Sequence, residues 1–367
     1  MPSLMMILRE IPDPRHGNAQ RHDLLDILTI ALVASVCGAE SCVDFAEFAE
    51  DREPLLREFL SLENGLPSHD TFSRVFRMLD PAAFGRTFEA FLTDLGADGA
   101  GVLAIDGKTL RRSFDRAAAR SPLHVVTAFG AQARLSFGQR AVAPGENEIT
   151  AARALLATLT LDGALVTGDA LHAQAETARL VLDRGGDWLF ALKANRPAML
   201  GEVAAFFADP PEPLETFETV DADHGRIETR RHRVTHCVDW LFGDRAEPDA
   251  PRMPGLATLA CVEATRDGGP PSTRYYLSSA RLTAERFARA VRSHWAIENS
   301  LHWVLDVTFD EDGARNRADN GPENLAILRR LTLNLLRTAR PKLPVSRKRK
   351  RSGWSDAFAR TVIGQMR

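Results

Sequence analysis

The stretch GVLAIDGKTL, Gly101–Leu110, decides the fold class of this 367-residue chain. It is a short apolar run without polar alternation, which is typical of a strand buried on both faces of a sheet. Its acid, Asp106, is followed by Gly107 and then by Lys108. The run therefore predicts a central strand that carries a carboxylate at its end.

The residues after this strand have the order expected of an α/β sheet. A predicted hairpin is followed by a helix, a second buried strand that ends at Asp169, a second helix and a further strand. These runs are, in chain order, LHVVTAFGAQ with SFGQRAVA, EITAARALLATL, GALVTGDALHA, AQAETARLVLDRGG and DWLFALK. Since α/β folds place their functional sites in the loops at one edge of the sheet, Asp106 and Asp169 become candidate site residues.

The flanking segments have other patterns. Residues 1–95 follow the helical period and predict an all-helical N-terminal domain. Within the α/β domain, residues 100–340, a stretch from about 200 to 280 is richer in Pro and Gly and mostly β-like, with a turn expected at His224-Gly225. We interpret this stretch as an insertion. Helical periodicity returns at residues 282–305 and 320–339, and residues 341–367 are expected to form a mobile basic tail.

The net charge of −3 does not indicate a nucleic-acid partner, but the charge distribution does. The stretch Arg329–Arg351 contains ten Lys and Arg and no acid, and basic runs also occupy Lys108–Arg120 and His224–Val234. Such patches could bind a polyanion if folding brings them together. The alternative is a solvated charged surface, which is the more common meaning of any single run.

The four cysteines and the hydropathy pattern indicate the compartment. Cys37, Cys42, Cys237 and Cys261 form no CxxC pair, so we expect reduced thiols rather than disulfides or a zinc site. No uncharged apolar run approaches the roughly 20 residues that cross a bilayer. We therefore expect a cytoplasmic protein without a membrane partner.

A polar stripe on a predicted helix completes the candidate site. His294, Glu298, His302 and Asp306 recur every four residues and would lie along one side of the helix. Asp and Glu supply the hard oxygen ligands that Mg²⁺ prefers. Two such ions can activate a water and stabilise the charge that develops on a phosphodiester. The acids Asp106, Asp169 and Glu298 thus predict a metal site for phosphodiester chemistry.

Other readings of these residues stay open. A single strand-end Asp is most often a turn former or a helix cap, and a single helical Glu is most often solvated. His294 and His302 could hold zinc together with Glu298, although the HExxH spacing of many zinc sites is absent.

At these residues the chain resembles the DDE transposases of bacterial insertion sequences, specifically the ISAs type that includes the H-repeat-associated proteins. The resemblance covers almost the whole length. It is carried by IPDPRHG, GLPSHDTFSRVFRMLDP, AIDGKTLRRS, NEITA, TGDALHAQ, LKANRP, HGRIETR, RSHWAIENSLHWVLDVTFDED and ENLAILRRL, which follow in the family's order.

The resemblance implies a ribonuclease-H-like catalytic core with a β-rich insertion before the glutamate-bearing helix. It also implies that Asp106, Asp169 and Glu298 hold two Mg²⁺ ions, with Mn²⁺ as a substitute. The implied reaction is cleavage at insertion-sequence ends, followed by attack of the freed 3′ hydroxyl on target DNA. The implied partners are double-stranded DNA, at the ends and at the target, and further copies of the chain in a dimer or larger assembly. A nucleoid association would follow from binding DNA.

The chain departs from the wider transposase group near the glutamate. Related proteins carry Tyr, Arg and Lys where this sequence has Val291, His294 and Leu305, so their DNA-contact role is not transferred. The candidate DNA contacts are instead cations and histidines near the predicted acids or in the insertion. They are Lys108, Arg111, Arg112, Arg226, Arg230, Arg231, Arg292, His294 and His302.

Three functional hypotheses follow. The first is an active transposase. The second is a domesticated or inactive DNA-binding remnant, since a fold alone does not establish activity. The third is a ribonuclease-H-like nuclease that hydrolyses DNA without strand transfer.

Overall fold

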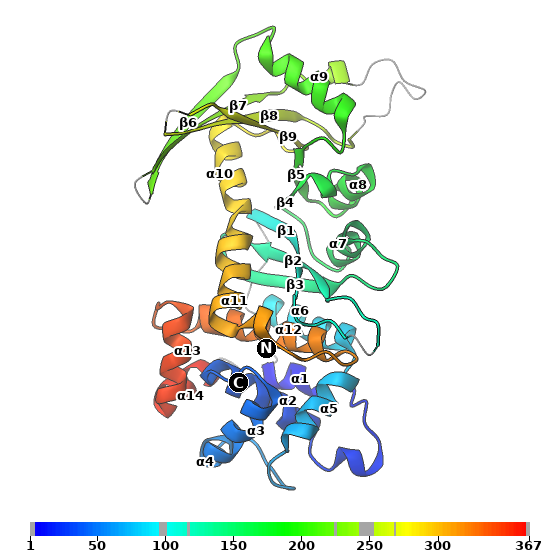
Figure 1. Cartoon of the computed structure of the whole chain (residues 1–367), viewed down its shortest axis with the longest axis vertical. Helices are drawn as coiled ribbons and strands as arrows, with labels where there is room; N and C mark the ends of the chain where they lie inside the picture. The colour runs from blue at the N-terminus through cyan, green and yellow to red at the C-terminus, as the bar shows by residue number, and fades with distance from the viewer. Residues whose placement is uncertain are drawn as a thin grey trace.

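A nine-stranded sheet runs through the upper and middle parts of the molecule, and helices fill the lower end (Figure 1). The computed structural model describes residues 4–94, 101–115, 118–223, 226–241, 253–267 and 269–364. The strand order is β3-β2-β1-β4-β5-β9-β8-β7-β6. The strands are β1 (Gly101–Thr109), β2 (His124–Gly130), β3 (Leu135–Ala141), β4 (Ala164–Gly168), β5 (Asp187–Leu192), β6 (Glu215–Asp223), β7 (Arg226–Thr235), β8 (Thr258–Arg266) and β9 (Ser272–Ser278).

The predicted order of strand, hairpin, helix, strand, helix and strand is confirmed. Strands β2 and β3 form the hairpin, and α7 (Glu148–Leu156) and α8 (Ala175–Asp183) separate the later strands. Strand β1 pairs antiparallel with β2 and parallel with β4, and β4 pairs parallel with β5. Residues 102–105 of β1 are buried, as the unbroken apolar run predicts for a central strand.

The β-rich insertion extends the same sheet. Strand β9 pairs antiparallel with β5, and β8, β7 and β6 follow outward. The predicted β-like start of the insertion at residue 200 is wrong, because α9 (Pro197–Ala208) is a helix. Its buried residues Met199, Val203 and Phe207 recur every four residues, a helical period that composition alone concealed. The predicted turn at His224-Gly225 lies outside the described residues.

The described residues of the N-terminal segment contain helices and loops only. The helices are α1 (Leu4–Arg9), α2 (Leu24–Cys37), α3 (Cys42–Asp51), α4 (Glu53–Leu56), α5 (His69–Met78) and α6 (Pro81–Asp94), with a short 3-10 turn, η1 (Gly17–Gln20). Helix α2 is buried nearly all round. None of the described helices is by itself long and apolar enough to span a membrane; α2 and α3, bent by 90°, reach that length and composition only as a pair.

The C-terminal helices pack on these N-terminal helices. Helix α12 (Gly321–Thr338) contacts α2, α5 and α6, and both α13 (Val345–Trp354) and α14 (Asp356–Ile363) contact α2. The prediction of a mobile basic tail from residue 341 is therefore wrong. Lys348 and Arg349 are buried, because their cationic groups bind backbone carbonyls at the ends of neighbouring helices. A charge run in the sequence does not reveal such partners.

All four cysteines are free. Cys42 and Cys261 are buried, and burial raises their pKa to about 11.

Candidate metal centre

The sheet register brings the two predicted aspartates to the same level. In the parallel β1–β4 pair, Ala104 lies opposite Thr167. Asp106 and Asp169 each lie two residues further along, Asp106 within β1 and Asp169 directly after the end of β4. Because side chains alternate between the faces of a sheet, both aspartates share the face of Thr167, whose hydroxyl contacts His294 of α10 (Ala284–His294).

Glu298 reaches this face from an irregular helical turn. The predicted helix over residues 282–305 is divided into α10, a π-helical turn, η4 (Ile297–His302), and α11 (Trp303–Phe309). The backbone N–H of Trp303 bonds to the carbonyl of Glu298, five residues back. Such π-turns are rare and occur frequently at functional sites, since the extra residue redirects the neighbouring side chains.

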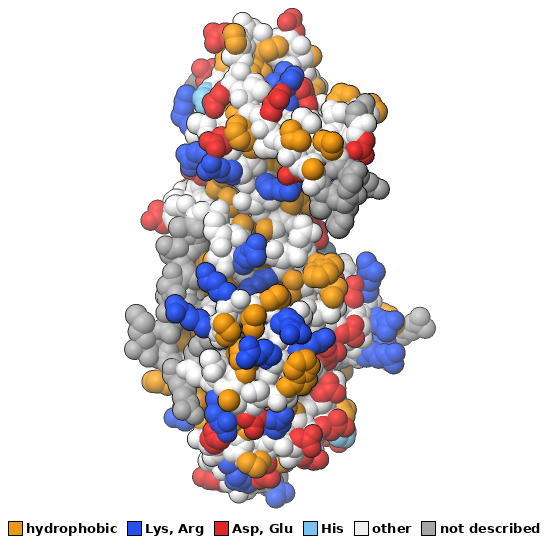
Figure 2. Space-filling view, turned by 90° about the vertical axis from the view of Figure 1, so that its left-hand side faces the viewer, with side chains coloured by type: hydrophobic (Ala, Val, Ile, Leu, Met, Phe, Trp, Pro, Cys, Tyr) orange, Lys and Arg blue, Asp and Glu red, His pale blue; other side chains and the backbone are white. Residues whose placement is uncertain are grey.

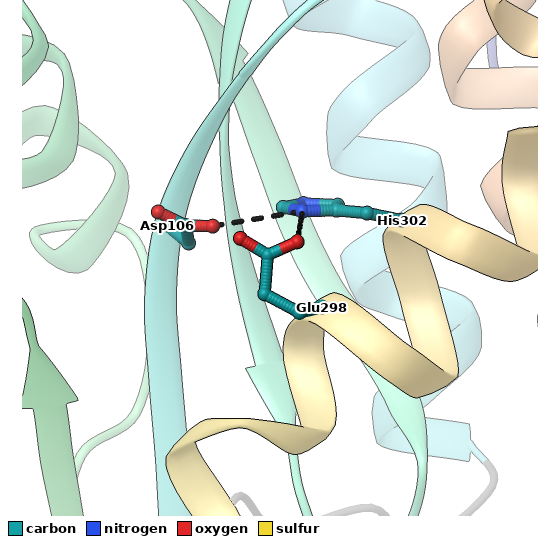
Figure 3. Close-up of side chains that lie close together, drawn as sticks. All are labelled: Asp106, Glu298 and His302. Carbon is teal, nitrogen blue, oxygen red and sulfur yellow. Dashed lines mark ion pairs between the residues drawn. The ribbon is translucent and has the colours of Figure 1, made fainter.

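The π-turn and β1 place three side chains in contact (Figure 3). The Nδ1 atom of His302 lies 3.5 Å from Oδ2 of Asp106 and 3.4 Å from Oε2 of Glu298. One ligand atom from each residue lies within 4.8 Å of the other two. Within the described part of the chain, this is the group of three such side chains that is close enough to hold a metal ion. The prediction that Asp106 and Glu298 converge agrees with this geometry.

The electrostatics of this group favour a cation. Burial, followed by the nearby Glu298 carboxylate, raises the pKa of Asp106 to about 7. Burial, followed by the charge of Arg330, lowers the pKa of His302 to about 4. The imidazole is thus neutral near pH 7 and cannot neutralise the two carboxyl groups, whereas a divalent cation can.

Asp169 lies outside this tight group. Its side chain accepts a hydrogen bond from the N–H of Leu171 at 2.8 Å, as the cap of the short turn η2 (Ala170–His172), and lies 3.9 Å from Lys193. It is half exposed. The charge of Asp169 acts on the half-buried His294, where it opposes the lowering of the pKa of His294 to about 4 by desolvation. Asp169 therefore stays outside the group of Asp106, Glu298 and His302, and its charge acts on His294 beside that group.

Lys108 does not lie on the surface as a phosphate contact would. Its ammonium pairs with Asp306 and lies 3.2 Å from Oε2 of Glu311, and its side chain is 10% exposed. Glu311 is fully buried and also binds Arg330 at 2.7 Å. These charges form a largely buried network that joins β1 to α11 and α12 on the face of β1 that carries Asp106.

The other predicted DNA contacts differ in accessibility. Arg111, 82% exposed, and the exposed Arg112 lie beside the end of β1, with Arg111 3.3 Å from Asp312. Arg231 and Arg292 are exposed but paired with Glu218 and Asp221 respectively.

The remaining candidates are less accessible. Arg230 is largely buried between Asp221 and Glu228, and the side chain of Arg226 lies outside the described residues. His294 and His302 belong to the pocket rather than to the surface.

The face that includes α10 is rich in cations. Figure 2 shows Lys and Arg side chains gathered over the middle of this face, mixed with exposed hydrophobic side chains. Helix α10 contributes the exposed Arg289 and Arg292, and Trp295 and Trp303, which flank Glu298 in the sequence, are 47% and 60% exposed. Cationic and aromatic groups thus lie near the acidic pocket.

Sequence reasoning did not single out Glu148 or Glu311. The carboxylate of Glu148 accepts a hydrogen bond from His124 and lies 3.3 Å from the imidazole of His172. Glu311 lies within ion-pair distance of both Lys108 and Arg330. Glu148 lies in the NEITA motif, and this position could have marked it as a functional residue. Nothing local distinguishes Glu311 from other acids in the EDG turn, because its partner Arg330 lies in another helix.

Two known sequence families cover most of the chain. Residues 97–335 match the transposase DDE domain family, and residues 5–92 match the DDE_Tnp_1-associated family. The first match alone includes the sheet, Asp106, Asp169 and Glu298. The chain therefore belongs to the DDE transposase family.

Its relatives place it within the H-repeat group of that family. The chain is 36% identical over 340 residues to the "H repeat-associated putative transposase YhhI" of Escherichia coli (strain K12), covering 91% of this chain and 90% of that protein. It is 34% identical over 378 residues to the "Putative transposase YncI" of Escherichia coli O157:H7, covering 98% of this chain and 94% of that protein.

A solved structure of a piggyBac transposase synaptic complex with hairpin DNA is also similar. The TM-score is 0.44 at 12% identity, covering 96% of this chain and 76% of that chain. This similarity is too low to carry an argument about the present chain.

Proposed function

We propose that this transposase cleaves DNA at insertion-sequence ends and transfers the freed strand into target DNA by a two-metal-ion mechanism. The observation that carries the proposal is the contact of Asp106 on β1 with Glu298 and His302 on the π-turn. Asp169, directly after the adjacent strand β4, lies at the same height along the sheet as Asp106. We assign strands β1–β5 with α7 and α8 to a ribonuclease-H-like core, which the strand order and the acid positions support.

The residues present fit a divalent cation. Asp106 and Glu298 offer hard oxygen donors, and the raised pKa of Asp106 indicates a carboxyl pair that a cation would stabilise. Asp106, Glu298 and Asp169 would hold Mg²⁺ or Mn²⁺, with the neutral imidazole of His302 as a further donor. When bound, two such ions supply activation of the attacking oxygen and stabilisation of the leaving oxygen.

The protein's own groups prepare this site. Below its raised pKa, the carboxyl of Asp106 keeps a proton that it must release before its oxygen can bind a cation. The zinc alternative, with His294 and His302 as joint ligands, has less support, since the Nδ1 of His294 bonds to Thr167 at 3.1 Å and His294 does not join the tight group.

Exposed cations near the pocket are the DNA contacts that we favour. Arg111, Arg112 and Arg292 combine exposure with proximity to β1 or α10, and Arg231 is a more distant candidate. Contacts to phosphates would make the affinity for DNA fall steeply with salt. A dimer or larger assembly is proposed because two transposon ends must be held together, and the site of action would be DNA of the bacterial nucleoid.

The test compares labelled insertion-sequence-end DNA with and without Mg²⁺ for the wild type and for Asp106→Ala, Asp169→Ala and Glu298→Ala. Each variant should lose cleavage by at least about 100-fold, while binding to the ends stays within about twofold, because the metal site and not the DNA surface is removed. Asp51→Ala, on an exposed acid at the end of α3, is the control and should keep the wild-type cleavage.

The products separate the alternatives. Joined donor and target strands support a transposase, whereas nicks alone indicate a nuclease. End binding without any cleavage by the wild type indicates an inactive remnant. Full cleavage by any of the three alanine variants would remove that residue from the site.

A further inference from the structure

A second cluster of ionisable side chains lies behind the metal centre. Oε2 of Glu148, in the first turn of α7, accepts a hydrogen bond from Nε2 of His124 on β2 at 2.7 Å. The other oxygen, Oε1, lies 3.3 Å from Nε2 of His172, in the turn after β4. Glu148 thus joins three segments that are separate in the sequence.

This cluster connects the two strand ends that carry the aspartates. Nδ1 of His124 also bonds to the hydroxyl of Thr109 on β1 at 2.8 Å. The contacts therefore run from Thr109 through His124 and Glu148 to His172. Thr109 lies three residues beyond Asp106, and His172 lies three residues beyond Asp169. A single carboxylate consequently spans the ends of β1 and β4.

The glycines beside the aspartates make room for the cluster. A Cβ on Gly107 would lie 2.5 Å from both Oε2 of Glu148 and Nε2 of His124. A Cβ on Gly168 would lie 3.0 Å from the Cβ of His172. Because Asp106 and Gly107 point to opposite faces of β1, the cluster supports the strand from the face opposite Glu298. The Asp-Gly and Gly-Asp pairs are thus explained by the space that Glu148 and its histidines occupy.

The ionisable side chains of this cluster are largely withdrawn from solvent. His172 is 1% exposed, and the side chains of Glu148 and His124 are 20% and 29% exposed. Both ring nitrogens of His172 are buried without a hydrogen-bond partner, and the carboxylate of Glu148, 3.3 Å from Nε2, is the charged group that its imidazole faces. Burying these polar groups is unfavourable unless they are paired, and the paired carboxylate is close enough for its charge to act on Asp106.

We propose that Glu148, held by His124 and His172, is a positioning residue that fixes the ends of β1 and β4 so that Asp106 and Asp169 can share divalent cations. This inference rests on the proposed function. Groups that orient metal ligands from behind typically change metal affinity or activity by about 10- to 100-fold when they are altered. Glu148 itself stays on its own face of the sheet and contacts neither DNA nor the cation.

The test uses the full chain and the isosteric variant Glu148→Gln, which removes the charge and one acceptor without removing volume. Mn²⁺ binding is measured by titration without DNA, and cleavage of end DNA is measured as a function of Mg²⁺ concentration. The variant should bind Mn²⁺ about 10- to 100-fold more weakly and should need correspondingly more Mg²⁺ for half-maximal cleavage. Excess Mg²⁺ should restore most of the cleavage, and end binding should stay within about twofold.

Two further variants make the result decisive. Glu146→Gln, two residues away and paired at the surface with Arg140, is the matched control and should keep the wild-type metal dependence. His124→Asn provides a second break in the same chain of contacts and should shift the metal dependence in the same direction as Glu148→Gln. An unchanged Mn²⁺ affinity in Glu148→Gln, even with a lowered melting temperature, would overturn the positioning role.

Asp106→Asn separates this inference from the function on which it rests. If Asp106→Asn still binds Mn²⁺ and cleaves, the proposed function fails. If Asp106→Asn is inactive while Glu148→Gln behaves as the wild type at limiting metal, the positioning role alone fails.

Discussion

At the residue scale, the site combines groups whose charges are set by burial. Burial and Glu298 keep the pKa of Asp106 near 7, and burial lowers the pKa of His294 and of His302 to about 4. Near neutral pH the histidines are therefore uncharged, and they can accept a hydrogen bond or a metal. The pocket consequently presents acids and neutral imidazoles to a cation rather than preformed ion pairs.

His294 gives a pH prediction. Between pH 6.5 and about 4 the unfolded state binds a proton at His294 that the folded state does not, so this residue's contribution to stability falls as the pH drops through that window. In EDTA, the free energy of unfolding of the wild type relative to His294→Asn should decrease from pH 6.5 to 4.5. The slope should be at most about 1.4 kcal/mol per pH unit.

Urea denaturation at several pH values measures this difference. The comparison with the variant is needed because Asp106, whose pKa is raised, contributes stability with the opposite pH dependence. His69→Asn, on an exposed histidine, serves as the control. A pH-independent difference between the wild type and His294→Asn would contradict the prediction.

At the scale of elements, the basic C-terminal helix α13 is a structural part rather than a tail. The ammonium of Lys348 is buried and donates hydrogen bonds to the carbonyls of Leu336 at 2.6 Å and of Ala339, where α12 ends. Lysine at a helix C-terminus satisfies carbonyls that have no partner within the helix. The cation thus joins α13 to α12.

Replacing this lysine should destabilise the fold. Lys348→Met keeps most of the apolar stem but leaves the buried carbonyls without their donor, so we expect a loss of about 1–3 kcal/mol in the free energy of unfolding. Lys350→Met, on the exposed side of the same helix, should change stability by less than about 0.5 kcal/mol. Urea denaturation of both variants tests this, and equal effects would argue against the docked position of α13.

At the scale of the whole molecule, the N-terminal helices and the α/β sheet share one continuous core. Ile30 of α2, Leu331 of α12 and Phe129 of β2 belong to the same cluster of buried hydrophobic side chains. Helix α12 contacts both the N-terminal helices and β3. The N-terminal helices and the α/β sheet are therefore expected to unfold together.

A substitution that creates a cavity around α2 tests whether the two parts unfold together. Four of the five tryptophans lie outside the C-terminal helices that pack on α2, so the fluorescence reports mainly on the α/β part; these four are Trp188, Trp240, Trp295 and Trp303. Ile30→Ala, at a fully buried position, should destabilise the fold by about 2–5 kcal/mol and shift the tryptophan transition by the same amount. Val43→Ala, at an exposed position, is the control. A fluorescence transition unaffected by Ile30→Ala would indicate two independently unfolding units.

The sequence by itself determined most elements of the α/β core and their order along the chain. Strand β1 follows from an apolar run, the hairpin and the alternating helices follow from period and turn signals, and these are local properties of the chain. Asp169 could be placed at the end of its strand for the same reason, whereas the predicted strand-end position of Asp106 is wrong, because β1 continues to Thr109 through its pairing with β2. Glu298 could be singled out by the polar stripe of its helix, and the resemblance of its long motif to a known family gave it the role of third ligand.

Only the tertiary structure decided which charges are buried and what they face. The contact between His302 and Asp106 depends on a helical irregularity, the π-turn. The partners of Lys108 and the packing of α13 on α2 depend on residues about 200 or more positions apart in the sequence. A local pattern records how polar a segment is, whereas the free energy of burying a charge depends on the partner that packing supplies. For this reason a basic run that looks solvated in the sequence forms part of the core.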